Sequence, residues 1–254
     1  MINVILCGCG GRMGRAVTDA VGENDRFRIV AGVDINASSL GAACDFPIYQ
    51  SISDFPGKAD VIIDFSHHSA LPCLAEYASA TGTPLVIATT GHSDEEMDIM
   101  KNTSEAVPVF FSRNMSIGIN LLIEMCRRAA RTLGTDFDVE IIEKHHNKKL
   151  DAPSGTALMI AEALSEERGE TELVYDRHER RERRKSSEIG IHAIRGGTIV
   201  GEHDVIFAGN NEIVTLSHTA TSREIFANGA LKAAEFIIGK KPAAYNMSDI
   251  INEI

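Results

Sequence analysis

The chain has 254 residues, is 44% hydrophobic and carries a formal net charge of −11, so it is long and apolar enough for two modest domains with their own cores. The acidic balance argues against nucleic acid as the main partner. No apolar run reaches the length of a membrane span, no signal peptide opens the chain, and its five cysteines form no C-x-x-C pair, so we expect a cytoplasmic protein without a membrane partner.

A glycine-rich turn follows the first predicted strand. Residues 3–6 form this strand, and the stretch GCGGRMG after it has the spacing G-x-x-G-x-x-G. Gly8 allows the tight turn from strand to helix, and Gly10 or Gly11 allows a pyrophosphate to approach the backbone closely. Gly14 allows the following helix to pack on the strand. The pattern predicts a dinucleotide-binding turn, and the alternative is a glycine-rich turn without a ligand.

An acidic residue stands where a ribose-binding group is expected. The predicted strand 27–33 ends in Asp34, which lies 20 positions beyond Gly14. A carboxylate there accepts hydrogen bonds from a ribose 2′-hydroxyl and repels a 2′-phosphate, and no basic residue follows it immediately. We therefore expect NADH to serve at least as well as NADPH. Arg12 and Arg15 could reach a phosphate, so use of both cofactors stays open.

Short apolar strands alternate with helices through the first half of the chain, which predicts a parallel sheet covered by helices. In such a sheet ligands bind at the carboxyl ends of the strands, so the loops DFSHHS and ATTGHS are candidate cofactor contacts. Their histidines, His67, His68 and His92, are expected at the rim, because no metal-ligand spacing surrounds them. The predicted strands are residues 60–65, 84–90 and 108–112, and the predicted helices are residues 69–81 and 93–103, the second with Ser93 and Glu96 in capping-box spacing.

The second half predicts a smaller α+β domain. A long helix over residues 116–133 leads into a strand over residues 136–143, and β-branched residues between glycine turns predict antiparallel strands within residues 189–219. A last helix over residues 225–238 is expected to return to the first domain, because the sheet there is otherwise short of a covering helix.

A charged run, DRHERRERRK, occupies residues 176–185. It interleaves Glu179 and Glu182 with its basic residues, and it contains no aromatic side chain on which a base could stack. We therefore expect a mobile surface loop rather than a nucleic-acid-binding patch.

The stretch EKHHNKKLDAPSGTAL, residues 143–158, concentrates groups that handle protons and bind anions. His145 and His146 are side chains whose ordinary pKa lies near neutrality. Positive charge comes from three nearby lysines, Lys144, Lys148 and Lys149.

A helix begins within the same stretch. Ser154 is the predicted N-cap, so the backbone N–H groups of Ser154, Gly155 and Thr156 are expected to face a carboxylate or phosphate. The alternative interpretation is a solvated basic loop followed by an ordinary capped helix.

Six segments together closely resemble the 4-hydroxy-tetrahydrodipicolinate reductase family, also called dihydrodipicolinate reductases: GCGGRMG, ATTG, SRNMSIGIN, EKHHNKKLDAPSGTAL, RGGTIVGEH and SREIFANGA. The resemblance covers essentially the whole chain, and the histidine-lysine-SGT stretch is its most specific part. The chain departs from the family pattern at Ser112 and Arg113, where Ala-Pro is frequent, at Asn147 and Lys148, and in the loop HERRERRK.

The resemblance implies an NAD(P)H-dependent reduction of 4-hydroxy-tetrahydrodipicolinate to tetrahydrodipicolinate in lysine and diaminopimelate synthesis. It implies that His145 is the acid/base and that Lys149 is the proton donor. The implied substrate contacts are His146, Ser154, Gly155 and Thr156. The implied nucleotide contacts are Gly8, Cys9, Gly10, Gly11, Arg12, Met13, Asp34, Ala88, Thr89, Thr90, Ser112, Arg113, Asn114 and Met115.

The expected fold class is α/β with two domains. A Rossmann-like dinucleotide-binding domain would comprise residues 1–115 and 224–254, and a smaller α+β domain for substrate binding and oligomerisation would comprise residues 116–223. The resemblance also implies a homotetramer built through the strands of the second domain. Hydride transfer would require the domains to close about hinges near residues 114–118 and 221–225.

Two other functions stay open. One is a different two-domain dehydrogenase that acts on an aldehyde through a cysteine nucleophile, although no cysteine lies beside the histidines in the sequence. The other is a non-catalytic nucleotide sensor whose basic cluster binds the acidic tail of a partner. Thiol labelling that substrate protects against would favour the first, and absence of cofactor turnover would favour the second.

Overall fold

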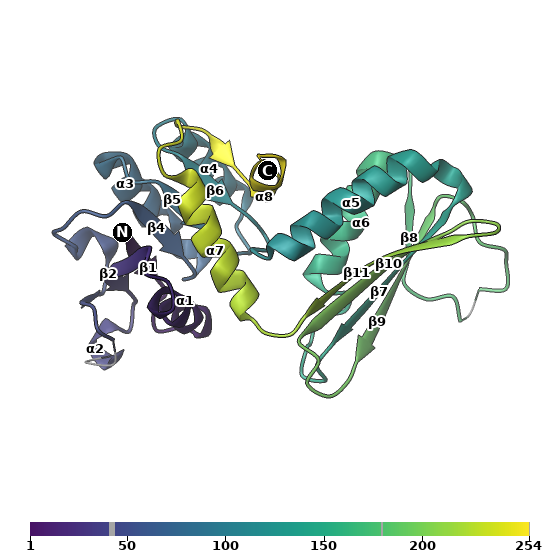
Figure 1. Ribbon diagram of the computed structural model, residues 1–254, viewed down its shortest axis with the longest axis horizontal. Helices are drawn as coiled ribbons and strands as arrows, with labels where there is room; N and C mark the ends of the chain where they lie inside the picture. Colours follow the sequence, from purple (N-terminus) through teal and green to yellow (C-terminus); the bar gives the residue numbers. More distant parts are fainter. Residues whose placement is uncertain (41–43, 179, 254) are drawn as a thin grey trace. The chain divides into compact units, whose positions relative to one another are not determined.

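The chain folds into two compact units in the computed structural model (Figure 1). The first unit combines Met1–Ile117 with Arg223–Ile254, and the second is Gly118–Ser222. Among the described residues, no helix is both long enough and apolar enough to cross a membrane. The structure describes residues 1–40, 44–178 and 180–253.

The first unit is built on seven parallel strands: β1 (Ile2–Cys7), β2 (Phe27–Val33), β3 (Ile48–Tyr49), β4 (Val61–Asp64), β5 (Leu85–Ile87), β6 (Val109–Phe111) and β12 (Ala244–Tyr245). Their order in the sheet is β12-β6-β5-β4-β1-β2-β3. From β3 to β6 this is the 3-2-1-4-5-6 order of dinucleotide-binding sheets, in which ligands bind where the order reverses, between β1 and β4. The predicted Rossmann-like fold is therefore confirmed.

Helices cover both faces of this sheet: α1 (Arg12–Gly22) and α7 (Glu224–Ile237) share one core, and α3 (Leu71–Thr81) and α4 (Asp94–Ser104) share the other. Successive residues of β1 point to opposite faces, so Leu6 joins the core of α7 whereas Ile5 joins the core of α3. Burial on both faces explains why these strands are continuous apolar runs. Two short helices complete the unit, α2 (Ala37–Leu40) and α8 (Met247–Asn252).

Local capping signals set the helix ends. The predicted capping box of α4 is confirmed, because Ser93 Oγ accepts the backbone N–H of Glu96 at 3.3 Å and Glu96 Oε2 accepts that of Ser93 at 2.8 Å. Helix α3 begins two residues later than predicted, because the 3-10 turn η3 (His68–Ala70) precedes it. It ends at Gly82, whose φ of 71° lies in the left-handed region.

The second unit contains a mixed sheet of five strands: β7 (Asp138–His145), β8 (Glu172–Val174), β9 (Glu188–Arg195), β10 (Gly201–Ala208) and β11 (Ile213–Ala220). Their order is β11-β10-β7-β9-β8. Strand β10 pairs antiparallel with β11 and β7, whereas β9 pairs parallel with β7 and β8. The expectation of antiparallel strands is therefore wrong for β9. Gly196 and Gly197 predict the turn after β9, but the sequence does not show that β7 lies between β9 and β10 in the sheet.

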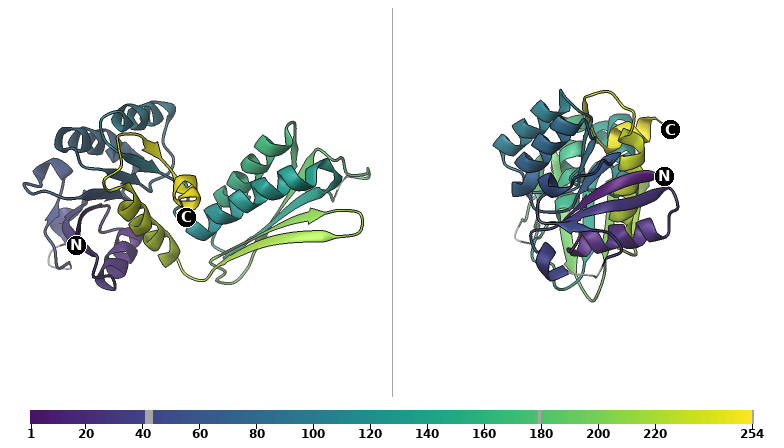
Figure 2. Two further views of the ribbon diagram at one scale, coloured as in Figure 1. Left: turned by 45° about the horizontal axis from the view of Figure 1, so that its top comes forward. Right: turned by 90° about the vertical axis from the view of Figure 1, so that its left-hand side faces the viewer.

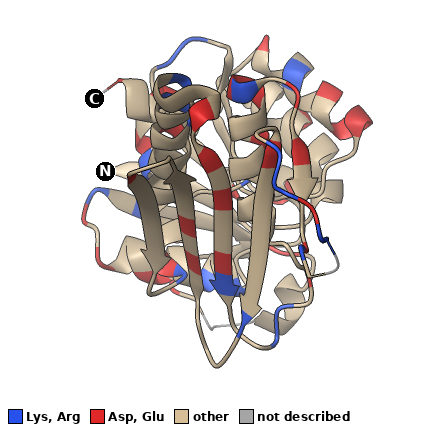
Figure 3. Cartoon of the chain, turned by 90° about the vertical axis from the view of Figure 1, so that its right-hand side faces the viewer, with Lys and Arg blue, Asp and Glu red and all other residues tan. Residues whose placement is uncertain are grey.

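Two helices, α5 (Ile117–Leu133) and α6 (Gly155–Arg168), lie side by side on one face of this sheet (Figures 1 and 2). Ile141 of β7 packs in the same core as Leu122 of α5 and Ile160 of α6. Alternate residues point to the other face of the sheet. Asp and Glu residues recur along its neighbouring strands (Figure 3). The same alternation places Lys144 and His145, adjacent on β7, on opposite faces of the sheet.

The charged run of residues 176–185 is tied to the second unit through Arg184. The guanidinium of this residue lies 2.7 Å from Asp138 Oδ1 and 2.9 Å from Glu140 Oε1, and the side chain is 15% exposed. Part of the expected surface loop is thus fixed to β7, and Arg184 is not available as a nucleic-acid contact. Glu179, one of the acidic residues noted in the run, lies outside the described residues.

Candidate active site and dinucleotide site

A buried glutamate holds the first of the two adjacent histidines. Glu143 and His145 lie two positions apart on β7, so they point to the same face of the sheet. Glu143 is fully buried, and its Oε2 lies 2.6 Å from His145 Nδ1. Arg195, at the end of β9, donates to both oxygens of Glu143 at 2.7 Å, and the backbone N–H of Ser154 donates to Oε1 at 3.0 Å. The carboxylate of Glu143 therefore connects His145 to the end of β9 and to the start of α6.

The protonation of this pair follows from its surroundings. Burial raises the pKa of Glu143, but hydrogen bonds from Arg195, His145 and Ser154 outweigh this and hold the pKa below its ordinary value. The ionised carboxylate then accepts the Nδ1–H of His145. Burial lowers the pKa of His145, although Glu143 opposes the change. His145 is therefore a neutral imidazole at neutral pH, with an Nε2 lone pair that can take up a proton.

A second buried histidine supports the start of α6. Ser154 Oγ accepts the backbone N–H of Ala157 at 3.1 Å, which confirms the predicted N-cap. His203 on β10 places its Nε2 3.1 Å from the same oxygen, and its ring meets that of His145 edge-on, with centroids 5.3 Å apart. Burial lowers the pKa of His203 to about 4, so this ring is neutral. The helix N-terminus, which attracts anions, thus lies beside the Glu143–His145 pair.

The three lysines of this stretch do not form one cluster. Lys149 Nζ lies 2.8 Å from Asp151 Oδ2, and the positive charge of Lys149 adds to burial in lowering the pKa of His145. Lys148 is exposed to solvent. Lys144 points to the opposite face of β7, where its Nζ lies 2.9 Å from Glu202 Oε2. The expectation that Lys144 adds charge to the site is therefore wrong, and strand alternation is the reason.

The remaining candidate substrate contacts take different places at this site. His146 is half-buried, and its Nδ1 has no hydrogen-bond partner among the described residues. The backbone N–H of Ser154 is bound to Glu143, so Ser154 acts as the cap of α6 and that N–H is not directed at a ligand. Gly155 and Thr156 form the first turn of α6, where backbone N–H groups point out of the helix end.

Three residues of this arrangement were not predicted as site residues: Glu143, Arg195 and His203. The alternation of side chains along a strand could have indicated Glu143, because Glu143 and His145 lie on the same face of β7. Arg195 and His203 could not be placed from the sequence, since the order β10-β7-β9 depends on pairing between distant segments.

The glycine-rich turn has the geometry of a phosphate-binding loop. Gly8 has a φ of 75°, and a Cβ there would lie 2.6 Å from Phe65 O. A Cβ on Gly14 would lie 2.2 Å from Gly8 O, so only glycine lets α1 approach the loop this closely. Gly11 caps α1 without a side-chain hydrogen bond, which leaves the first N–H groups of the helix to other acceptors. These features fit the pyrophosphate of a dinucleotide.

Asp34 follows β2 and lies against the glycine-rich turn. Its Oδ2 accepts the backbone N–H of Gly10 at 3.0 Å, and its Oδ1 accepts that of Asn36 at 2.9 Å. A Cβ on Gly10 would lie 2.9 Å from Asp34 Oδ2, so the turn and the carboxylate are in direct contact. This position beside the turn fits a group that binds the ribose of the same nucleotide.

The other implied cofactor contacts lie at the carboxyl ends of two strands. Residues 88–90 follow β5, and residues 112–115 follow β6, so both segments are on the ligand-binding edge of the sheet. The side chains of Cys9 and Met115 are 2% exposed and belong to the core of the unit. A nucleotide could therefore reach only the backbone of these two residues.

The histidines of the loops after β4 and β5 lie near one another. His68 Nδ1 is 2.8 Å from Glu96 Oε1, and the ring centroids of His68 and His92 are 6.2 Å apart. His92 also meets the ring of Phe111 edge-on, with centroids 5.6 Å apart. Across the described residues, no three His, Cys, Asp or Glu side chains come together as metal ligands would.

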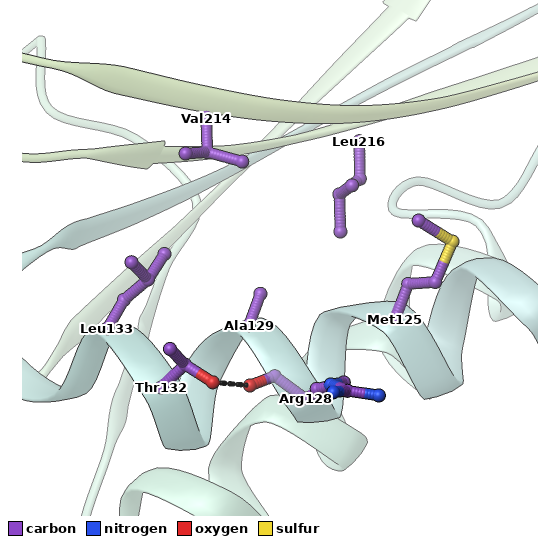
Figure 4. A pocket seen from close by; sticks show the side chains of 7 residues that line it. All are labelled: Met125, Arg128, Ala129, Thr132, Leu133, Val214 and Leu216. Carbon is purple, nitrogen blue, oxygen red and sulfur yellow. Dashed lines mark hydrogen bonds between the residues drawn. The ribbon is translucent and has the colours of Figure 1, made fainter.

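An apolar groove of about 300 Å³ also opens in the second unit, between α5 and β11 (Figure 4). Val214 and Leu216 point from β11 toward Ala129 and Leu133 of α5. Arg128 is the one ionisable side chain that lines the groove among the described residues. The groove has no acid–base pair, so the candidate catalytic site is the buried Glu143–His145 arrangement instead.

The chain is similar to known proteins along almost its whole length. The family models "Dihydrodipicolinate reductase, N-terminus" and "Dihydrodipicolinate reductase, C-terminus" match residues 2–115 and 118–251. Proteins named 4-hydroxy-tetrahydrodipicolinate reductase from Caldanaerobacter subterraneus subsp. tengcongensis and Clostridium tetani are 53% and 47% identical, over 100% and 99% of this chain and 99% and 98% of their own. A dipicolinate-bound dihydrodipicolinate reductase from Paenisporosarcina sp. TG-14 matches with a TM-score of 0.81 and 26% identity, covering 98% of this chain and 99% of that one. The chain belongs to the dihydrodipicolinate reductase family.

Proposed function

We propose that the protein is an NAD(P)H-dependent oxidoreductase that reduces 4-hydroxy-tetrahydrodipicolinate to tetrahydrodipicolinate, a step of lysine and diaminopimelate biosynthesis. The observation that carries the proposal is the buried Glu143–His145 pair beside Lys149 and the start of α6. The first unit of the same chain has the strand order of a dinucleotide-binding sheet. The names of the relatives from C. subterraneus and C. tetani support the choice of substrate.

The second unit supplies the groups that a dicarboxylate needs. In our proposal, the backbone N–H groups of Gly155 and Thr156, in the first turn of α6, bind one carboxylate with the help of the helix dipole. His146 and Lys149 contact the substrate from the preceding loop. The dipicolinate bound to the Paenisporosarcina relative is itself a dicarboxylate, which supports this assignment.

The reduction consumes a hydride and a proton and releases the 4-hydroxyl group as water. The nicotinamide, when bound, supplies the hydride. Lys149 donates the proton from its ammonium group, and His145 exchanges a proton through Nε2. Glu143 keeps Nδ1 protonated and stabilises the imidazolium when it forms. Arg195 balances the charge of the buried carboxylate.

Three of the five cysteines are buried and poorly suited to act as a nucleophile. Cys126 is the one cysteine of the second unit, and burial raises its pKa to about 12. In the first unit, burial raises the pKa of Cys9 to about 11 and that of Cys7 well above its ordinary value. Because the thiolate is the reactive form, these three thiols are poor nucleophiles for an aldehyde.

The cofactor, the assembly and the location extend the proposal. NADH serves at least as well as NADPH, because Asp34 lies beside the phosphate-binding turn and repels a 2′-phosphate.

The chain forms a homotetramer through the strands of the second unit. The strand face opposite α5 and α6 supports this, because it exposes 47% of Ile194 together with polar side chains. We place the enzyme in the cytoplasm, where its free cysteines stay reduced.

The direct test is the oxidation of reduced nicotinamide in the presence of the condensation product of aspartate semialdehyde and pyruvate. We expect NADH and NADPH to be oxidised only when this product is supplied, and dipicolinate to inhibit the reaction. Reactions without pyruvate serve as the control. Tight NADH binding without turnover would favour a nucleotide sensor and would overturn the proposal.

A further inference from the structure

Asp64 is a fully buried carboxylate at the end of β4, the strand that borders the point where the sheet order reverses. Its Oδ1 accepts the backbone N–H of Ser66 at 3.0 Å and the Oγ–H of Ser66 at 2.5 Å. Its Oδ2 accepts the Oγ1–H of Thr89 at 2.6 Å. One side chain therefore receives three hydrogen bonds from two different loops.

A carboxylate suits this set of donors, because both of its oxygens accept. Two hydroxyls and one amide donate to Asp64, and they use both carboxyl oxygens. An asparagine amide has a single acceptor oxygen and would turn a donor toward one of the hydroxyls. Burial raises the pKa of Asp64 above its ordinary value, although the hydrogen bonds from Ser66 and Thr89 oppose the change. No salt bridge to Asp64 occurs within the described part of the chain, so these donors are its main compensation for burial.

Three segments of the candidate dinucleotide site meet at Asp64. Thr89 belongs to the segment after β5, and the backbone N–H of Ala88 in the same segment donates to Asp64 O at 2.9 Å. Ser66 belongs to the loop after β4. A Cβ on Gly8 would lie 2.8 Å from Ser66 Cα, so the glycine-rich turn packs directly on the loop that Asp64 holds.

We infer that Asp64 is the positioning residue of the dinucleotide site. It does not touch the nucleotide. Its carboxylate fixes the loop after β4 and the segment after β5, and through Ser66 it fixes the surface on which the glycine-rich turn rests. The nucleotide therefore meets backbone groups that are already in place, and it does not have to order them on binding. The inference rests on the dinucleotide part of the proposed function.

Asp60, which is exposed, provides a control at the other end of the same segment. Its Oδ2 accepts the backbone N–H of Asn3 at 2.7 Å and the side-chain Nδ2–H of Asn3 at 3.0 Å. Asp60 also joins β4 to β1, but it does so at the amino end of the strands, away from the ligand-binding edge. A loss of nucleotide affinity is therefore expected from replacing Asp64 and not from replacing Asp60.

The experiment measures NADH dissociation constants by fluorescence titration for Asp64→Asn, Thr89→Val, the double variant and Asp60→Asn. We expect the constant to rise about tenfold or more in each of the first two, because Asp64→Asn removes the charge that strengthens these hydrogen bonds and Thr89→Val leaves the buried Oδ2 of Asp64 without a partner. Asp60→Asn should stay within about twofold of the wild type. The double variant should be little worse than either single variant, because both remove the same hydrogen bond.

Further measurements distinguish a specific loss of NADH affinity from a loss of folding, and a failure of this inference from a failure of the proposed function. Thr89→Ser retains the hydroxyl and should recover most of the affinity lost in Thr89→Val. The NADH KM should rise more than kcat falls, and dipicolinate binding should not change. Normal NADH affinity in both Asp64→Asn and Thr89→Val, or strictly additive losses in the double variant, would overturn the inference. Wild-type protein that does not bind NADH would instead overturn the proposed function.

Discussion

Glu143 Oε2 and His145 Nδ1 lie 2.6 Å apart on one face of β7, and the glutamate is fully buried. This contact selects the tautomer of His145 whose Nε2 carries the lone pair. It also brings the charge of Arg195 and the start of α6 to the same carboxylate. The proposed role of His145 in proton exchange therefore depends on Glu143, a fully buried neighbour.

Replacing Glu143 by glutamine should lower kcat at least about tenfold, because the amide neither fixes the tautomer nor stabilises the imidazolium. Glu143 acts to raise the pKa of His145, so the pH at which His145 titrates in the kcat profile should move downward in the variant. NADH affinity should not change. Glu140→Gln, on the opposite face of β7, is the control and should keep kcat within about twofold. Equal effects of the two variants would contradict this role.

His203 should make the protein sensitive to acid. Its folded pKa of about 4 lies below the ordinary value of 6.5, so the unfolded chain takes up the proton first as the pH falls. The stability that this neutral ring contributes is present above pH 6.5 and is lost between pH 6.5 and 4. The loss amounts to about 3 kcal/mol. His203→Asn should lose correspondingly less stability over this window, as measured by urea denaturation at a series of pH values. Parallel curves for the two proteins would rule the effect out.

Cofactor preference should depend on Asp34. We expect the wild-type kcat/KM for NADPH to exceed that for NADH by no more than about tenfold, a difference near 1.4 kcal/mol. Asp34→Ala should shift the ratio toward NADPH, because the repulsion of a 2′-phosphate disappears. Steady-state kinetics with both cofactors measure the ratio. A wild-type preference for NADPH beyond this limit would show that the carboxylate does not govern the choice.

The protein should form a homotetramer, with a mass four times the 27.5 kDa of one chain. Light scattering at micromolar concentration measures the mass directly, and a mass of 27.5 kDa would contradict the predicted tetramer. Ile194→Glu places a charge on the exposed strand face and should lower the assembly mass. Ile238→Glu in the first unit, also at an exposed isoleucine, should leave the mass unchanged.

The sequence predicted most of the first unit, because strands buried on both faces are apolar throughout. The run containing Ile5 and Leu6 shows this pattern, since neighbouring residues pack into different cores. The N-cap Ser154 was equally readable, because capping depends on local hydrogen bonds. The edge strands β3 and β12 were missed, since two residues are too few to show a period.

The candidate site could be predicted from the sequence only in part, for a different reason. Arg195 and Glu143 are 52 positions apart, and they meet because β9 pairs parallel with β7. No local pattern shows this pairing. Lys144 was counted with the site because sequence proximity does not distinguish the two faces of a strand.

In the proposed mechanism, Lys149 and His145 act through their positions and not as diffuse charge. The decisive measurement is kcat, together with the NADH dissociation constant, for Lys149→Ala and Lys148→Ala. We predict that Lys149→Ala lowers kcat by about 10² to 10⁴ while NADH affinity barely changes, because the nucleotide binds in the first unit. Lys148 is exposed and equally charged, so Lys148→Ala should cost far less. Equal losses in the two variants, or near-normal kcat in Lys149→Ala, would contradict the claim.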